Sequence, residues 1–153
     1  IAASIDVSIS NLTFGTAVQF DPDQSSITKK ENSLSYILHP RKFVSMTLSD
    51  EGTKKTRKIY GAYPFNDSMH LFGGLDRTTS TGVTNAETTG IAYESCCWAL
   101  RLAHFKEDNG SGGYNYSTGI ELVLSGLGST ATPLKDRIEE KIPDYSANLR
   151  YKP

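Results

Sequence analysis

The sequence predicts an α+β fold in which two C-terminal helices cover one face of an antiparallel sheet. Apolar and polar residues alternate in several stretches over the first two thirds of the chain, which is typical of half-buried strands. Past residue 117 the apolar spacing becomes helical and helix-capping residues occur. At 153 residues, with 37% hydrophobic and 22% charged residues, we expect a single domain covering 1–153.

The first 22 residues predict an N-terminal β-hairpin. Ile5, Val7 and Ile9 alternate with polar residues, and the alternation resumes at Val18 before the chain reaches Pro22. A proline here ends the second strand, because it cannot donate to a ladder of backbone hydrogen bonds.

Residues 34–105 predict the antiparallel sheet. Residues 44–49 alternate apolar with hydroxyl side chains, and a turn leads to a return strand at 57–63. Residues 91–105 form the longest strand-like stretch. Its alternate residues fall into two sets, or parities: one is bulky and apolar, and the other is smaller and more polar.

The segment 73–90 is rich in glycine and threonine and has little apolar content. It predicts a long exposed loop inside the sheet region, and loops of this length usually serve a function or are flexible.

The C-terminal part predicts two helices within 117–143. Thr118 and Glu121 fit a Thr-x-x-Glu capping box at the start of the first helix, and Pro133 suits the first turn of the second. Residues 144–153 are left as a tail without an assignment.

Catalysis, metals and cofactors are not expected. The three histidines are scattered, and the sequence contains no Cys-x-x-Cys, Gly-x-Ser-x-Gly or phosphate-loop motif. No run of about 18 apolar residues occurs and no signal peptide is visible, so neither a transmembrane helix nor secretion is expected.

The net charge of −1 conceals a basic strip at 29–58. This strip holds eight of the 16 Lys and Arg residues and three acidic ones, so it carries +5 and the remainder −6. Together with the long strand it could present one polar face, made of Ser45, Thr47, Ser49, Lys54, Lys55, Arg57, Lys58, Tyr93 and Ser95. Cations, hydroxyls and an aromatic ring on a sheet can bind single-stranded RNA, although composition alone favours an ordinary solvent-facing surface.

Four segments in order resemble the coat proteins of single-stranded RNA bacteriophages (leviviruses). Residues 42–49 with 56–60 resemble the central hairpin of that family. Residues 18–22 resemble the end of its N-terminal hairpin, 92–95 its long final strand, and 120–145 its two C-terminal helices.

The resemblance implies a fold and an assembly. It implies an N-terminal hairpin, a five-stranded antiparallel sheet and two C-terminal helices, in an intertwined homodimer whose two sheets are continuous. The bulky apolar parity would lie under the helices and the hydroxyl parity would face the capsid interior. The 73–90 loop would meet neighbouring subunits around the symmetry axes.

The resemblance also implies a function: a structural capsid protein without catalysis that forms a T=3 icosahedral shell. Its partners would be further copies of itself and the hairpin-containing genomic RNA, with repression of replicase translation as a second role and no membrane. The protein would be made in the cytoplasm of a bacterial host and reside in the virion.

The resemblance assigns site roles residue by residue. Ser45 and Thr47 fall on hydroxyl positions of the RNA-binding strand, Lys58 on a basic position, Tyr93 on the base-stacking tyrosine and Ser95 beside it. Further phosphate contacts would come from Lys54, Lys55 and Arg57. The alternative is a secreted β-rich pilus or adhesin subunit, favoured by the short strands and the Ser/Thr/Asn content, and a small hydrolase comes third.

Overall fold

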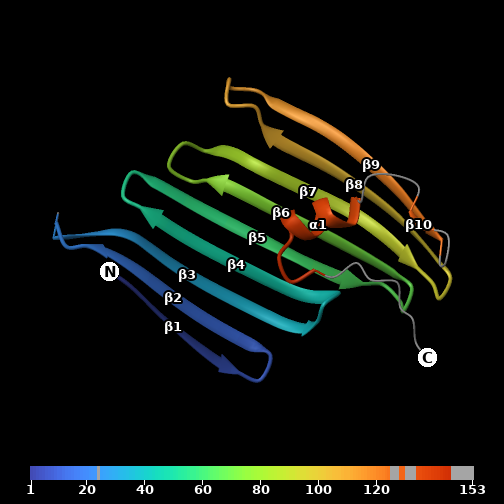
Figure 1. Ribbon diagram of the computed structural model, residues 1–153, viewed down its shortest axis with the longest axis horizontal. Helices are drawn as coiled ribbons and strands as arrows, with labels where there is room; N and C mark the ends of the chain where they lie inside the picture. The colour runs from blue at the N-terminus through green and yellow to red at the C-terminus, as the bar shows by residue number, and fades with distance from the viewer. Residues whose placement is uncertain (24, 125–127, 130–133, 146–153) are drawn as a thin grey trace.

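The computed structural model describes residues 1–23, 25–124, 128–129 and 134–145. In these residues the chain forms one ten-stranded sheet in which each strand pairs antiparallel with the next along the sequence (Figure 1). The strands are β1 (Ala2–Ile9), β2 (Leu12–Asp21), β3 (Ser26–His39), β4 (Lys42–Glu51), β5 (Lys54–Pro64), β6 (Met69–Thr78), β7 (Val83–Glu94), β8 (Trp98–Asp108), β9 (Tyr114–Leu124) and the two-residue β10 (Gly128–Ser129). The expected hairpin of residues 1–22 corresponds to β1 and β2.

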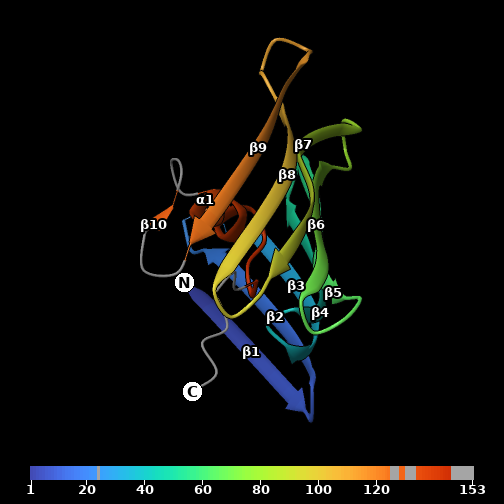
Figure 2. The same ribbon diagram turned by 90° about the vertical axis from the view of Figure 1, so that its right-hand side faces the viewer.

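A single helix among the described residues, α1 (Leu134–Lys141), packs against one face of the sheet (Figures 1 and 2). Ile138 and Ile142 are fully buried in a cluster with Phe72 and Phe105. An ion pair adds to this packing: Lys141 Nζ, at the end of α1, lies 2.8 Å from a carboxylate oxygen of Glu107 in β8. We call the face that carries α1 the helix-side face and the opposite one the outer face.

The expected five-stranded sheet with two C-terminal helices is wrong. The first expected helix falls on β9, whose residues pair with β8 from Trp98↔Leu124 to Asp108↔Tyr114. The short apolar run at 120–124 fits either period, and pairing with β8 decides for the strand. The second expected helix corresponds to α1, while its predicted N-terminal residues 132–133 lie outside the described residues.

The intertwined dimer is wrong for the same reason. It required two helices per chain to cover the sheet of a partner, whereas α1 packs on the sheet of its own chain. In the part of the chain that the structure describes, no helix has the length and apolar character needed to cross a membrane.

The expected loop at 73–90 is also wrong. These residues complete β6 and begin β7, and only residues 79–82 form the turn between them. Threonine is β-branched and suits a strand. Gly90 leaves room for the ring of Phe72, since a Cβ at this position would clash with that ring.

Candidate functional site

The outer face is apolar across nine strands. Because paired residues point to the same side of a sheet, the register assigns each strand residue to one face. Outward-facing large apolar residues include Ile5, Val7, Ile9, Leu12, Phe14, Leu34, Tyr36, Val44, Met46, Leu48, Ile59, Tyr63, Leu71, Leu75, Ile91, Tyr93, Trp98, Leu100, Leu102, Ile120, Leu122 and Leu124. Most of them are exposed, and no described element covers them.

Charged side chains of the outer face are displaced to one end of the strands. They lie near the turns at 22–25, 52–53, 79–82 and 109–113, which we call the charged end. They are Lys30, Asp50, Lys55, Arg57, Arg77, Glu87, Lys106 and Asp108. Between them and the opposite, apolar end runs a band without outward-facing charge, and Lys42 is the charged strand residue at the apolar end.

Aromatic side chains border this band at the apolar end. Tyr36, Tyr63 and Tyr93 point outward within the last few residues of their strands, and Trp98 points outward from the first residue of β8. Tyr93 and Trp98 lie against each other, with ring centroids 4.6 Å apart. Such rings combine an apolar body with a polar edge, which suits a boundary between an apolar and an aqueous medium.

The helix-side face contains a buried charge network. Arg101 Nη1 lies 2.8 Å from Glu121 Oε2, and Arg101 Nη2 lies 3.2 Å from Glu94 Oε1. Arg41, from the turn between β3 and β4, pairs with the other oxygen of Glu94. All four side chains are at least nine-tenths buried, and two positive and two negative groups balance. Because buried charges are costly unless paired, the network fixes β7, β8 and β9 to the β3–β4 turn.

A hydrogen bond joins the segment after α1 to the sheet. The Tyr145 hydroxyl and His70 Nε2 lie 2.6 Å apart, and both side chains are buried beside Phe72. Burial raises the pKa of Tyr145 well above its usual range, so the phenol stays protonated. The helix-side face is therefore a region of paired polar groups and small apolar clusters.

The structure does not bring the predicted site residues together. Ser45, Thr47, Lys54 and Lys58 belong to the helix-side face, Lys55, Arg57 and Tyr93 to the outer face, and Ser95 to the turn after β7. Consecutive strand residues point to opposite faces, so Arg57 and Lys58 cannot share one surface. Ser45 is buried beside its register partner Tyr60, and Lys58 pairs with Asp76 at 3.6 Å.

The expected orientation of the two parities is reversed. The bulky residues, including Val44, Leu48 and Leu100, are exposed instead of lying under helices, and the smaller and more polar parity carries α1. The charge network was missed as well. Its signal was present at Arg101, a charged residue set among alanines in the parity opposite Trp98.

Similarity to known proteins points to one kind of protein. No family model matches the chain. The LPS-assembly protein LptD of Shewanella sp. (strain MR-4) is 28% identical over 97% of this chain and 23% of its own length. The protein of the same name from Aeromonas salmonicida (strain A449) is 26% identical over 85% of this chain, and that of Nitrosococcus oceani is 30% identical over 57%.

The chain thus spans less than a quarter of the length of these relatives. Their name overturns the resemblance to phage coat proteins, and with it the capsid, the T=3 shell, the genomic RNA partner, the translational repression and the virion location. The alternative of a secreted pilus or adhesin subunit is wrong too. The chain is similar to proteins of lipopolysaccharide assembly.

Proposed function

We propose that this chain serves lipopolysaccharide assembly, and that its sheet stands in a membrane with the outer face against lipid. The charge-free apolar band carries this proposal. In a water-soluble sheet the face without a cover is polar, whereas here it is apolar and the covered face is charged. Apolar side chains outward and polar side chains inward are what strands in contact with lipid require.

The dimensions of the band support the same proposal. On β2 the outward positions from Leu12 to Phe20 carry no charge, and about nine tilted residues suffice for a strand to cross a bilayer. Tyr36, Tyr63, Tyr93 and Trp98 would lie at one membrane surface, where aromatic residues concentrate. Lipid offers no water to free backbone groups, so the edge strands would pair there with further strands.

The two faces suit an amphiphile such as lipopolysaccharide, which has acyl chains and an anionic sugar portion. A wall that is apolar on one side and polar on the other keeps these portions in different media. The polar side is built on paired charges, so it tolerates a polar interior without unpaired buried ions.

Membrane insertion can be tested with Trp98, the single tryptophan of the chain. The protein is reconstituted into vesicles of phosphatidylcholine brominated on its acyl chains, and its fluorescence is compared with that in unbrominated vesicles. We expect strong quenching by brominated lipid and little quenching by aqueous iodide. Quenching by iodide alone would show that the outer face meets water and would refute the membrane placement.

The role in lipopolysaccharide assembly can be tested with a chimera. The aligned segment of the Shewanella sp. (strain MR-4) relative is replaced by this chain, since the alignment covers 97% of it. We expect surface lipopolysaccharide to remain near the level of the parent. A chimera that inserts at normal levels but leaves lipopolysaccharide inside the cell would count against this role.

A further inference from the structure

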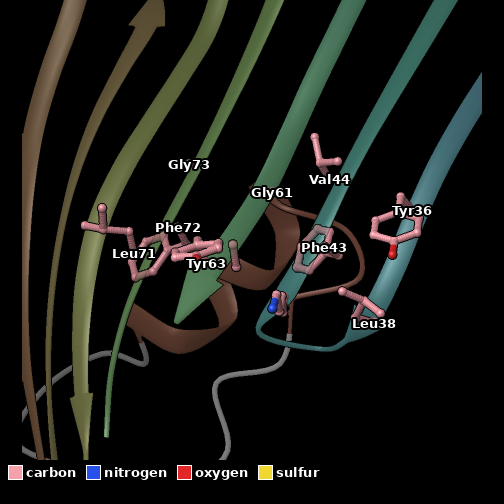
Figure 3. Close-up of a pocket in the computed structure, with 11 residues that line it drawn as sticks. Tyr36, Leu38, Phe43, Val44, Gly61, Tyr63, Leu71, Phe72 and Gly73 are labelled. Atoms are coloured by element: carbon pink, nitrogen blue, oxygen red, sulfur yellow. The ribbon is translucent and has the colours of Figure 1, made fainter. Parts of the chain in front are cut away.

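A hollow interrupts the outer face where β5 and β6 lie side by side. Gly61 and Gly73 are register partners and both belong to the outer face, so neither contributes a side chain there. Val44 and Tyr36 stand on one side of the bare backbone, and Tyr63 and Leu71 stand on the other (Figure 3). The hollow has a volume of about 430 Å³, within the range of small-molecule sites, and its lining is almost entirely apolar.

Among the described residues that line this hollow, Lys42 is the one cation, and it stands at the apolar end. Its Nζ lies 5.8 Å from the centre of the Tyr63 ring. The described residues offer Lys42 no carboxylate within ion-pair distance, whereas Lys55 at the charged end pairs with Asp50 at 3.2 Å. The hollow therefore combines an apolar trough with a positive charge near its aromatic border.

We propose that this hollow binds one acyl chain of an anionic phospholipid, with the lipid phosphate beside Lys42. The proposal rests on the proposed membrane placement of the outer face. An acyl chain meets apolar side chains on both walls and backbone at the floor. The phosphate reaches the height of Tyr36 and Tyr63, where a lysine and the edges of aromatic rings are the expected partners of lipid headgroups.

Two variants separate the trough from the charge. Gly73→Leu fills the floor, and the nearest backbone atom to a Cβ at Gly73 is 3.3 Å away, so the substitution needs only a small shift. Lys42→Gln removes the charge while keeping most of the side-chain length. The matched controls are Ala3→Leu, which adds apolar bulk to the outer face of β1, and Lys30→Gln, which removes a lysine of the same face at the charged end.

The test uses the reconstituted protein in phosphatidylcholine vesicles that contain a small share of phospholipid with a photoreactive diazirine on one acyl chain. The labelled lipid is either phosphatidylglycerol, which is anionic, or phosphatidylcholine. Cross-linked residues are identified by mass spectrometry. We expect label to concentrate on Val44, Tyr63 and Leu71, with about fivefold more from phosphatidylglycerol, the factor that roughly 1 kcal/mol for one lysine corresponds to.

The variants give distinct outcomes. Gly73→Leu is expected to lower labelling of the hollow by both lipids, Lys42→Gln to remove the preference for phosphatidylglycerol, and both controls to match the wild type. Label spread evenly over the outer face, or equal labelling by the two lipids, would overturn the proposal. Quenching of Trp98 by brominated lipid is measured on every variant. Quenching without concentrated label refutes the lipid site alone, whereas absence of quenching refutes the membrane placement beneath it.

Discussion

Arg101 and Leu102 are neighbours in β8, yet they belong to surfaces of opposite chemistry. The Arg101 side chain is 3% exposed and binds two carboxylates, while Leu102 is 40% exposed and belongs to the band of outward apolar residues. In a protein surrounded by water, the leucine would be expected in the interior and the arginine at the surface. The contrast between the helix-side face and the outer face therefore supports the proposal that the two sides of this sheet meet different media.

The contrast also separates two sources of stability. The helix-side face gains from α1, from paired charges and from hydrogen bonds, all of which are present in the structure. The outer face has exposed ion pairs such as Lys55 with Asp50 at its charged end, but no described element packs on its apolar band, so we expect the band to be stabilised by the surrounding medium. Substitutions on the two faces should therefore respond differently to the presence of lipid.

The largest effect is expected from breaking the charge network. Arg101→Met leaves Glu94 and Glu121 buried without this partner, and loss of one member of such a group costs about 3–5 kcal/mol. Lys55→Met is the control, because the pair of Lys55 with Asp50 is exposed and worth about 0–1 kcal/mol. Urea unfolding of reconstituted protein measures both, and equal costs would show that the network is not effectively buried.

Truncating the helix contact should weaken the helix-side face by a comparable or smaller amount. Ile138→Ala removes a fully buried side chain from the cluster with Phe72 and Phe105, at a cost of about 2–5 kcal/mol. Lys135→Ala, on the same helix, is the control and should cost little. A loss in urea unfolding with unchanged Trp98 quenching would support a contact that does not involve the membrane, and no loss would argue against the packing of α1.

A charge on the outer face should be costly only at the depth of the apolar band. Leu102→Arg is expected to lower the unfolding free energy in vesicles by about 2–4 kcal/mol, the cost of an arginine at the middle of a bilayer. Asp108→Arg, on the same face of β8 at the charged end, should cost about 0–1 kcal/mol. Urea titration measures both costs, and equal costs for the two substitutions would contradict the expected dependence on depth.

The smallest effect concerns the hydrogen bond of Tyr145. Tyr145→Phe leaves His70 Nε2 without this partner and should cost about 1 kcal/mol at neutral pH. Because the raised pKa keeps the phenol protonated in the folded state where the unfolded state has lost its proton, stability falls as pH rises above about 10.

Tyr145→Phe should therefore flatten the loss of stability above about pH 10. Tyr116→Phe, on the exposed part of β9, should leave that pH dependence unchanged. If the unfolding free energy of Tyr145→Phe falls with pH as steeply as that of the wild type, the loss of stability at alkaline pH comes from other groups.

Local sequence patterns predicted strands well where bulky and small residues alternate. The strands expected at 44–49 and 57–63 lie within β4 and β5, and α1 lies where apolar spacing and a preceding proline indicated a helix. The segments 73–90 and 117–124 were assigned incorrectly. Threonine and glycine carry little periodic signal, and a short segment that is mostly apolar, such as 120–124, fits a helix or a strand until its neighbour is known.

The identity of the two faces could not be predicted from the alternation alone. A strand with one apolar parity looks the same whether that parity meets a core or a lipid, because both media are apolar. The charges of the opposite parity held the missing information. Arg101 is the register partner of Glu121, and Glu94 lies two residues along β7 from the register partner of Arg101; this became visible only when the strands were paired.

The most direct test of two media around one sheet is a nitroxide scan along β8. The two exposed cysteines are first replaced, as Cys96→Ser and Cys97→Ser, and single labels are then placed at residues 98, 99, 100, 102 and 103 of the reconstituted protein, with Arg101 kept. We expect labels at 98, 100 and 102 to collide with oxygen, which dissolves in lipid, and labels at 99 and 103 to be shielded. If labels at 98, 100 and 102 instead collide mainly with a water-soluble nickel complex, the outer face meets water and the account is contradicted.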